Sequence, residues 1–326
     1  MKFLQVGLGS MGKRRIRNLL HLGVDSNDIA GFDLSTERTT EIAKTYNILT
    51  DNNFERLDST FIPDAYIIST PPHIHAPYFL HAARKKRHFF VEVATTDDGY
   101  NELYPLLDTT FVAAPSFTFR YNSAVIKLKQ LVNNGAIGRV WAFNHHLGQY
   151  LPDWHPWEDY RSFYVSKKES SACREMVPYE LQWIQWVLDD DVSLAKGLTA
   201  KCSDLDISID DTYTALLQTS RGIVGTIMVD IIARPAVRIF RLLGSLGTLE
   251  WDWQRYTIRH YDAKLGSWKT LRLKKGTQLT EYKTTTEEMY NSEIADFLAA
   301  VEGKKEYPYS FAKDQKNFLL LKQIEQ

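Results

Sequence analysis

Short apolar runs alternate with longer amphipathic runs over about the first 120 residues of the chain. Runs that are short, apolar and often β-branched or aromatic predict strands, and the amphipathic runs between them predict helices. The predicted strands are 2–6, 29–33, 65–69, 88–93 and 110–113, and the predicted helices are 11–22, 35–46, 73–85 and 99–107. Such alternation predicts a parallel sheet with helices on both faces.

The pattern changes after Phe119. A helix over 122–134 should end at Gly135, and a strand (139–148), an aromatic loop and a helix (175–188) follow. Long β-like runs separated by turn signals then predict an antiparallel meander: 194–205, 212–219, 222–232, 237–244, 247–253, 256–262 and 268–273. A last helix, 289–301, precedes the tail.

Composition limits the classes of partner. The chain has 326 residues, enough for two domains, and its 39 basic and 40 acidic side chains leave a formal charge of −1. Nothing electrostatic therefore favours nucleic acid or an anionic membrane as a partner. The chain has no apolar stretch long enough to predict a membrane span. The two cysteines, Cys173 and Cys202, build no disulfide framework, so we expect a cytoplasmic protein.

A G-x-G-x-x-G sequence lies between the first predicted strand and the first predicted helix. In this context the first glycine permits a tight turn, the second lets the backbone approach a pyrophosphate, and the third lets helix and strand pack closely. The N-terminus of the helix offers unpaired N–H groups to the phosphates. We therefore predict that the cofactor binds at Gly7, Gly9, Ser10, Met11 and Gly12.

Asp33 ends the second predicted strand, about 20 residues past the glycines, where a carboxylate can bind the adenosine ribose. Its charge would repel a 2′-phosphate, so NAD is favoured over NADP, although Ser35 and Arg38 lie close enough to soften that preference. The alternative is a glycine turn in an unrelated βαβ unit. We expect an N-terminal Rossmann domain (1–120), a doubly wound parallel sheet, followed by a second domain (121–326), to which the family resemblance described next assigns substrate binding and oligomerisation.

Further motifs are S-T-P-P-H-I-H at 69–75, H-F-F-V-E at 88–92, F-R-Y-N at 119–122, G-A-I-G at 135–138, and Tyr290-x-x-Glu293. Together they resemble those of the glucose-fructose oxidoreductase, inositol dehydrogenase and rhizopine-catabolism (Gfo/Idh/MocA) family. The resemblance implies a C-terminal α/β domain with an open, mainly antiparallel sheet, whose last helix can pack back on the first domain. It also implies oxidation or reduction of a hydroxyl on a sugar or related compound with NAD(H) or NADP(H), and homodimers or homotetramers formed through the C-terminal sheet. Cofactor-binding roles for Thr70, Pro71, His75 and Glu92 follow from it as well.

The sequence departs from the family where the chemistry is expected. The family's E-K-P turn reads Glu92-Val93-Ala94, and valine can neither carry charge nor donate a hydrogen bond. The family's H-x-x-D positions hold Tyr179 and Gln182. Segment 170–173 replaces a glycine-rich approach to the same helix. We expect an NAD(P)-dependent oxidoreductase with atypical catalytic residues, or else a dinucleotide-binding sensor or assembly subunit, or a non-redox enzyme that recycles bound NAD.

In the first of these readings, Tyr179 is the candidate proton donor or acceptor, and Gln182 and Arg120 would orient the substrate. A phenol has an ordinary pKa of about 10, which a nearby cation lowers. We therefore hypothesise that Arg120, Arg174, His145 or His146 lies within about 6 Å of the phenol in place of the lysine. The alternative for Tyr179 is a packed core or interface tyrosine.

Other candidates for binding come from the aromatic loop and two histidine pairs. Trp154 and Trp157 offer flat faces for a sugar ring, although a subunit interface would use them equally well. Adjacent residues of a strand point to opposite faces, so only one histidine of the pair 145–146 can face a cleft, and we predict His146 as substrate-binding. His73-x-His75 lacks further ligands, so we expect no metal site.

Overall fold

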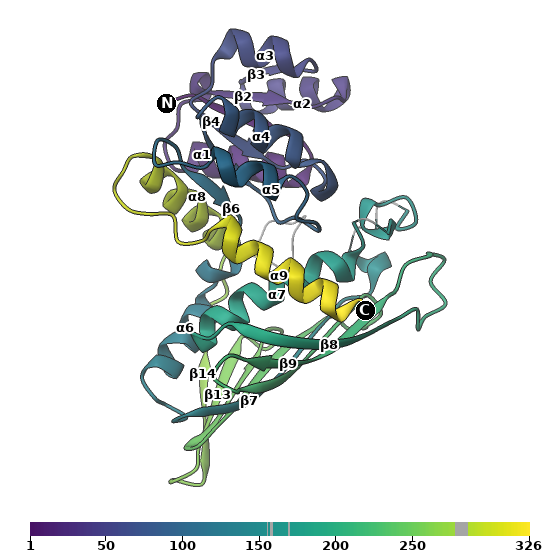
Figure 1. Ribbon diagram of the computed structural model, residues 1–326, viewed down its shortest axis with the longest axis vertical. Coiled ribbons are helices and arrows are strands. Elements are labelled where there is room, and N and C mark those ends of the chain that lie inside the picture. Colours follow the sequence, from purple (N-terminus) through teal and green to yellow (C-terminus); the bar gives the residue numbers. More distant parts are fainter. Residues whose placement is uncertain (155, 157–158, 169, 278–285) are drawn as a thin grey trace. The chain divides into compact units, whose positions relative to one another are not determined.

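The computed structural model describes residues 1–326 except 155, 157–158, 169 and 278–285, and these residues form two compact units (Figure 1). The first unit comprises residues 1–118 and 287–315. The second comprises residues 119–286 and 316–326. The chain therefore leaves the first unit, builds most of the second, and returns.

The first unit contains a parallel sheet of six strands in the order β3-β2-β1-β4-β5-β6. The strands are β1 (Phe3–Val6), β2 (Ile29–Phe32), β3 (Leu49–Asp51), β4 (Ala65–Ile68), β5 (His88–Val91) and β6 (Ala113–Pro115). Every residue of β1, β2 and β4 is buried, which explains their unbroken apolar sequences. The strand order is the doubly wound Rossmann arrangement, with its switch point between β1 and β4. The predicted fold of this domain is confirmed.

The first unit also contains the helices α1 (Ser10–His21), α2 (Thr36–Tyr46), α3 (Phe54–Phe61), α4 (Ala76–Arg84), α5 (Tyr100–Leu103) and α8 (Glu287–Val301). Helices α1 to α5 lie between the strands of this sheet in the sequence, and α8 follows much later. Helix α8 returns late in the sequence and packs on α1, and its Ile294 and Phe297 join the core that contains Ile16 and Leu19. The last predicted helix thus belongs to the first unit.

Three local predictions in this unit were wrong. β3 and α3 were not predicted, because β3 is a three-residue edge strand without a buried face. β6 lies at Ala113–Pro115 instead of 110–113. The fourth helix begins at Ala76 rather than at 73, because Pro72–Ile74 form a separate 3₁₀ turn.

The second unit contains one sheet of eight strands in the order β14-β13-β12-β11-β7-β10-β9-β8. The strands are β7 (Val140–Gly148), β8 (Val192–Ala200), β9 (Thr212–Thr219), β10 (Val224–Asp230), β11 (Val237–Gly244), β12 (Gly247–Asp252), β13 (Thr257–Asp262) and β14 (Ser267–Arg272). β7 and β10 pair in parallel and the remaining neighbours are antiparallel. The mainly antiparallel sheet is confirmed, but a simple meander is wrong, because β7 inserts between β10 and β11.

Helices α6 (Ser123–Asn133) and α7 (Ala172–Leu188) lie on one side of this sheet, together with the end of α9 (Phe311–Ile324) (Figure 1). α7 begins three residues earlier than predicted, where the Ser171 side chain accepts a hydrogen bond from the Arg174 amide, and it continues through Pro178. α9 lies where only a tail was predicted. From Tyr213 onward, the side chains of β9 alternate between buried and exposed. The exposed ones lie on the opposite face of the sheet, which no described helix covers.

Candidate functional site

The glycine loop between β1 and α1 has the shape that a pyrophosphate requires. Gly7 has a φ of +87°, and a Cβ there would lie 2.7 Å from the Ser69 carbonyl oxygen. A Cβ on Gly12 would lie 1.9 Å from the Gly7 oxygen. At Gly9, by contrast, an added Cβ would meet no atom within 4 Å, so the loop leaves open space at the one glycine that a phosphate should approach.

The start of α1 is available to an anion. Its N-cap is Gly9, and no side chain caps the helix. Ser10 and Met11 form the first turn, and their backbone N–H groups lie at the positive end of the helix dipole. These features fit a dinucleotide phosphate at the predicted position.

Asp33 follows β2 directly and holds the loop beside it. Its carboxylate accepts hydrogen bonds from the Leu8 amide at 2.8 Å and the Ser35 amide at 2.9 Å. The Arg38 guanidinium lies 3.5 Å from the same carboxylate and is half exposed. The carboxylate is therefore fixed next to the glycine loop, where a ribose hydroxyl could reach it.

The loop after β4 brings several unsatisfied polar atoms together. Ser69 Oγ, Thr70 Oγ1 and His75 Nδ1 are buried without a hydrogen-bond partner among the described residues. His75 is only 3% exposed, and its Nε2 lies 2.8 Å from the Thr70 carbonyl oxygen. Burial lowers the pKa of His75 to about 4, so the ring is neutral near pH 7. The adjacent Pro71 is exposed.

Glu92 belongs to a buried ionic network rather than to an open surface. Arg15 Nε lies 2.5 Å from the Glu92 carboxylate, and its Nη2 lies 2.8 Å from Glu293. Glu293 also accepts hydrogen bonds from residues 116–118. Burial raises the pKa of Glu92, and Arg15 opposes that rise. The network joins the start of α1, the end of β5, the end of β6 and α8, and it explains the Tyr290-x-x-Glu293 motif.

In the second unit, α7 carries the candidate catalytic residues. Tyr179 is half-buried, and its ring meets that of Phe119 edge to face at 5.1 Å. Gln182, one turn further along, is buried. The Arg120 guanidinium lies 4.8 Å above the ring of Trp186 on the same helix. Helix α7 and the 3₁₀ turn before α6 thus bring Tyr179, Gln182 and Arg120 into one region of this unit.

A buried charge cluster beside Tyr179 was not predicted. Glu180 is fully buried, and its carboxylate lies 2.8 Å from Arg238 Nη2 and 2.7 Å from His145 Nε2. Although burial alone would raise the pKa of Glu180, Arg238 and His145 hold it below its ordinary value. The Arg238 guanidinium also lies 4.3 Å from the centre of the Phe119 ring. The signal in the sequence was the presence of Arg238 within the mainly apolar run 237–244, which also contains Arg241.

Arg174, His145 and His146 each have an acidic partner. Arg174 pairs with Glu325 at 2.9 Å. His145 faces α7, so the neighbouring His146 points to the other face of the sheet, where its Nε2 lies 2.6 Å from Asp230. The structure therefore does not bring His146 to the side of the sheet that carries α7.

The aromatic loop is described only in part. The Trp154 indole N–H donates to the Gln149 carbonyl at 3.2 Å, so the ring orientation is fixed by the loop backbone. Tyr160 accepts a hydrogen bond from the Asp206 amide. Trp157 lies outside the described residues.

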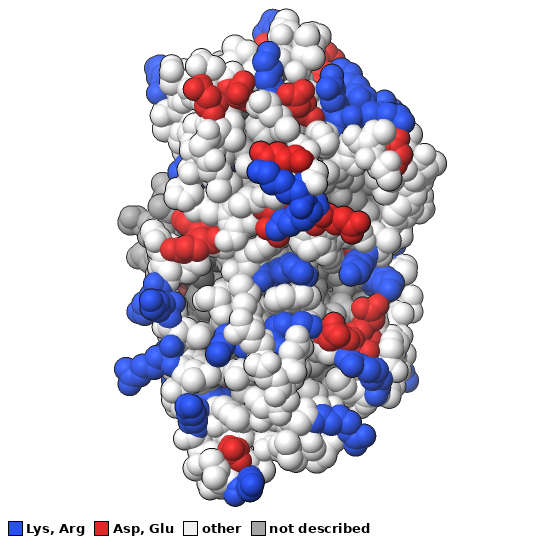
Figure 2. All heavy atoms as spheres, turned by 90° about the vertical axis from the view of Figure 1, so that its left-hand side faces the viewer, with Lys and Arg blue, Asp and Glu red and all other residues white. Residues whose placement is uncertain are grey.

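Most of the basic run 84–87 pairs with acidic side chains. Lys85 lies 2.5 Å from Asp58 and Arg87 lies 3.6 Å from Asp64, and acidic and basic side chains are interspersed on the face drawn in Figure 2.

Among the described residues, no group of three or more His, Cys, Asp and Glu side chains could hold a metal ion. Within the same residues, no helix is both long and apolar enough to cross a bilayer.

Comparison with known proteins decides the family. Residues 1–110 match the model of an oxidoreductase family with an NAD-binding Rossmann fold, and residues 125–250 match the Gfo/Idh/MocA C-terminal domain. The chain belongs to the Gfo/Idh/MocA family. The predicted family membership is thereby confirmed, with matches in both halves of the sequence.

Proteins similar to this chain in sequence or in fold include a dehydrogenase of the sugar derivative levoglucosan. Levoglucosan dehydrogenase from Pseudarthrobacter phenanthrenivorans is 34% identical over 97 residues, a match that spans 28% of this chain and about a quarter (24%) of that protein. The fold is similar to a levoglucosan dehydrogenase in complex with NADH, with a TM-score of 0.81, 18% identity, and coverage of 100% of this chain and 96% of that one. An oxidoreductase domain protein from Kribbella flavida has a TM-score of 0.84 at 16% identity, with coverage of 100% and 96%.

Proposed function

We propose that this member of the Gfo/Idh/MocA family is an NAD-dependent oxidoreductase that acts on a hydroxyl-bearing or keto carbon of a sugar or sugar derivative. The observation that carries the proposal is the glycine loop, which is closed around Gly7 and Gly12 but open at Gly9, beside the fixed carboxylate of Asp33. Bound NAD supplies the hydride acceptor or, when reduced, the donor. Gly7, Gly9, Ser10, Met11 and Gly12 would hold its pyrophosphate.

Asp33 favours NAD over NADP. Its carboxylate is already held by two backbone amides, so it cannot turn away from a 2′-phosphate without breaking them. The half-exposed Arg38 is the cation that could accept such a phosphate, but it already lies beside Asp33. Thr70, Pro71, His75 and Glu92 would complete the cofactor site, Glu92 by fixing the end of β5 through Arg15.

Tyr179 would accept the proton of the substrate hydroxyl during oxidation and return it during reduction. Its half-buried position on α7, with Gln182 and Arg120 in the same region, supports this role. The ring of Phe119 contacts both the Tyr179 ring and the Arg238 guanidinium, so the region contains a cation, which Val93 does not provide. Gln182, Arg120 and the aromatic loop, including Trp154 and Trp157, would orient the substrate.

The proposal is tested by following absorbance of reduced nicotinamide with NAD and a panel of sugars and nucleotide sugars. The panel should include levoglucosan and L-sorbose, which occur in complexes of the dehydrogenase with the similar fold. With an active substrate, Tyr179→Phe should reduce kcat about 100-fold or more, as expected for a lost acid–base group. Tyr261→Phe, on β13, is the matched control and should stay within about twofold of the parent. Equal rates for Tyr179→Phe and the parent would remove Tyr179 from the mechanism.

A second candidate is a dinucleotide-binding sensor or assembly subunit, or a non-redox enzyme with recycled NAD. Val93 in place of the family lysine favours it, because that position cannot assist proton transfer. It predicts that NAD binds while no panel member is oxidised or reduced. Such a result would shift the proposal to this candidate.

We also propose that the protein forms a homodimer or homotetramer through the uncovered face of the second sheet. Large apolar side chains exposed on this face are Leu194, Leu198, Leu216, Val224 and Ile239. Light scattering should show an oligomer that Leu216→Asp dissociates. Leu265→Asp, in the β13–β14 turn, is the control and should leave the oligomer intact.

We also propose a cytoplasmic location. Both cysteines are free, which agrees with it, and cell fractionation would test it.

A further inference from the structure

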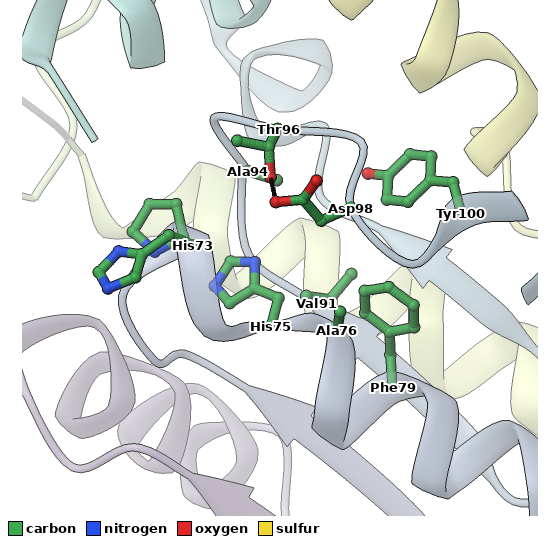
Figure 3. A pocket seen from close by; sticks show the side chains of 10 residues that line it. His73, His75, Ala76, Phe79, Val91, Ala94, Thr96, Asp98 and Tyr100 are labelled. Carbon is green, nitrogen blue, oxygen red and sulfur yellow. Dashed lines mark hydrogen bonds between the residues drawn. The ribbon is translucent and has the colours of Figure 1, made fainter. Parts of the chain in front are cut away.

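The first unit contains a small pocket at the carboxyl ends of β4 and β5 (Figure 3). α4 contributes Ala76 and Phe79, and β5 contributes Val91. The loop after β5 contributes Thr96 and Asp98. The ring of His75 points into the pocket and lies across from this loop (Figure 3).

The protonation state of His75 follows from its contacts. Nε2 lies 2.8 Å from the Thr70 carbonyl oxygen, which can only accept a hydrogen bond, so Nε2 carries the proton. Because burial lowers its pKa, the ring carries no second proton near pH 7. Nδ1 therefore presents a lone pair, and it is buried with no partner among the described residues. A buried acceptor in this state requires a donor.

On the opposite wall, the side chains of Thr96 and Asp98 offer no donor to satisfy it. Thr96 Oγ1 donates to the Asp98 carboxylate at 2.8 Å, so the proton of the hydroxyl is already used. A carboxylate is itself an acceptor. Phe79, Val91 and Ala94 line the pocket with apolar surface. The pocket thus selects a small group that has N–H or O–H donors and no negative charge.

The place of the pocket in the sheet indicates which group this is. In the order 3-2-1-4-5-6, the two halves of a dinucleotide lie over the two halves of the sheet. Asp33, after β2, marks the adenosine half, so the pocket beyond β4 and β5 lies on the nicotinamide half. The carboxamide NH₂ provides the N–H donors of the nicotinamide ring system.

We propose that His75 Nδ1 accepts a hydrogen bond from the carboxamide NH₂ of NAD, with the Asp98 carboxylate as a second acceptor. This inference rests on the proposed binding of NAD. In this contact the buried His75 ring would fix the rotation of the nicotinamide about its glycosidic bond. It is a binding contact and needs no proton transfer.

The experiment compares NAD with 3-acetylpyridine adenine dinucleotide, in which a methyl group replaces the NH₂, by calorimetric titration. The parent protein should bind NAD about 3- to 10-fold more tightly than the analogue, the size expected of one or two neutral hydrogen bonds. In His75→Phe this preference should fall to about one, because NAD binding weakens while analogue binding does not. His21→Phe, at an exposed residue at the end of α1 and outside the pocket, should keep the preference.

ADP-ribose, which lacks the nicotinamide, is the control ligand. Its Kd should stay within about twofold in His75→Phe, which shows that the glycine loop is intact. If that variant loses ADP-ribose binding, Asp98→Val replaces it, and an undiminished preference there overturns the inference. A parent protein without preference, or a His75→Phe variant that keeps it, also overturns it. Because only binding is measured, absence of turnover would count against the proposed reaction and not against this contact.

Discussion

Alanine at Gly9 and alanine at Gly12 should have opposite consequences although both change the same loop. Gly9 has an ordinary extended backbone, with φ of −69°, and nothing lies within 4 Å of an added Cβ. Alanine there restricts the unfolded chain, which stabilises, but it is a poorer N-cap than glycine, which destabilises, so Tm should change by no more than about 4 °C in either direction. At Gly12 the Cβ would lie 1.9 Å from a backbone oxygen, which forces a backbone shift costing about 1–3 kcal/mol and lowers Tm by about 2–12 °C.

Binding separates the two variants from a general effect on stability. In Gly9→Ala the methyl group occupies the open space that we assign to the pyrophosphate, so the Kd for NAD should rise at least about 10-fold, equivalent to about 1.4 kcal/mol. The measurements are calorimetric titration with NAD and thermal unfolding of the cofactor-free protein. A Gly9→Ala variant that binds NAD within twofold of the parent would refute the assignment. So would a loss of binding accompanied by a fall in Tm like that of Gly12→Ala.

Three further predictions concern buried charge, cofactor choice and pH. Arg15→Met should lower the free energy of unfolding in urea by about 3–5 kcal/mol because it strands buried carboxylates, and adding Glu293→Gln should recover part of this; strictly additive losses would contradict the network. Asp33→Ser should raise the ratio of NADP to NAD affinity at least about 10-fold in titrations, and an unchanged ratio would show that the carboxylate does not select the cofactor. The pKa of His75 falls from 6.5 to about 4 on folding, so the unfolded chain binds the extra proton first and stability declines as pH drops from about 6.5 to 4, by roughly 3 kcal/mol. His75→Phe should lose this part of the pH dependence and the exposed His21→Phe should retain it; equal slopes in urea unfolding would count against a buried neutral ring.

The dinucleotide half could be predicted because its determinants are local. Buried parallel strands need continuous apolar runs, and the turn after β1 needs glycine at Gly7 and Gly12, where any Cβ would meet backbone atoms. These constraints leave a mark within a few residues of sequence. Edge elements such as β3 have no buried face and leave no comparable mark.

The second unit was harder to predict because its determinants are long-range. Glu180 and Arg238 are 58 residues apart in sequence, and neither position alone indicates a buried ion pair. β10 could be predicted as a strand, but its parallel pairing with β7 depends on the whole sheet. Likewise, Tyr179 and Gln182 could be placed on one helix stripe, whereas the ring of Phe119 beside Tyr179 could not.

The ionic network around Glu293 has a consequence for biosynthesis. Glu293 follows its partner Arg15 by 278 residues, and α8 supplies Ile294 and Phe297 to a core that otherwise comes from the beginning of the chain. At about 5–20 residues per second, a ribosome needs on the order of ten to thirty seconds to translate residues 119–286. During that time the nascent Rossmann unit exposes an apolar surface, and the Arg15 guanidinium has only Glu92 of its two carboxylate partners. Nascent chains of this protein should therefore depend on chaperones until α8 emerges, and a fragment ending near residue 120 should be insoluble.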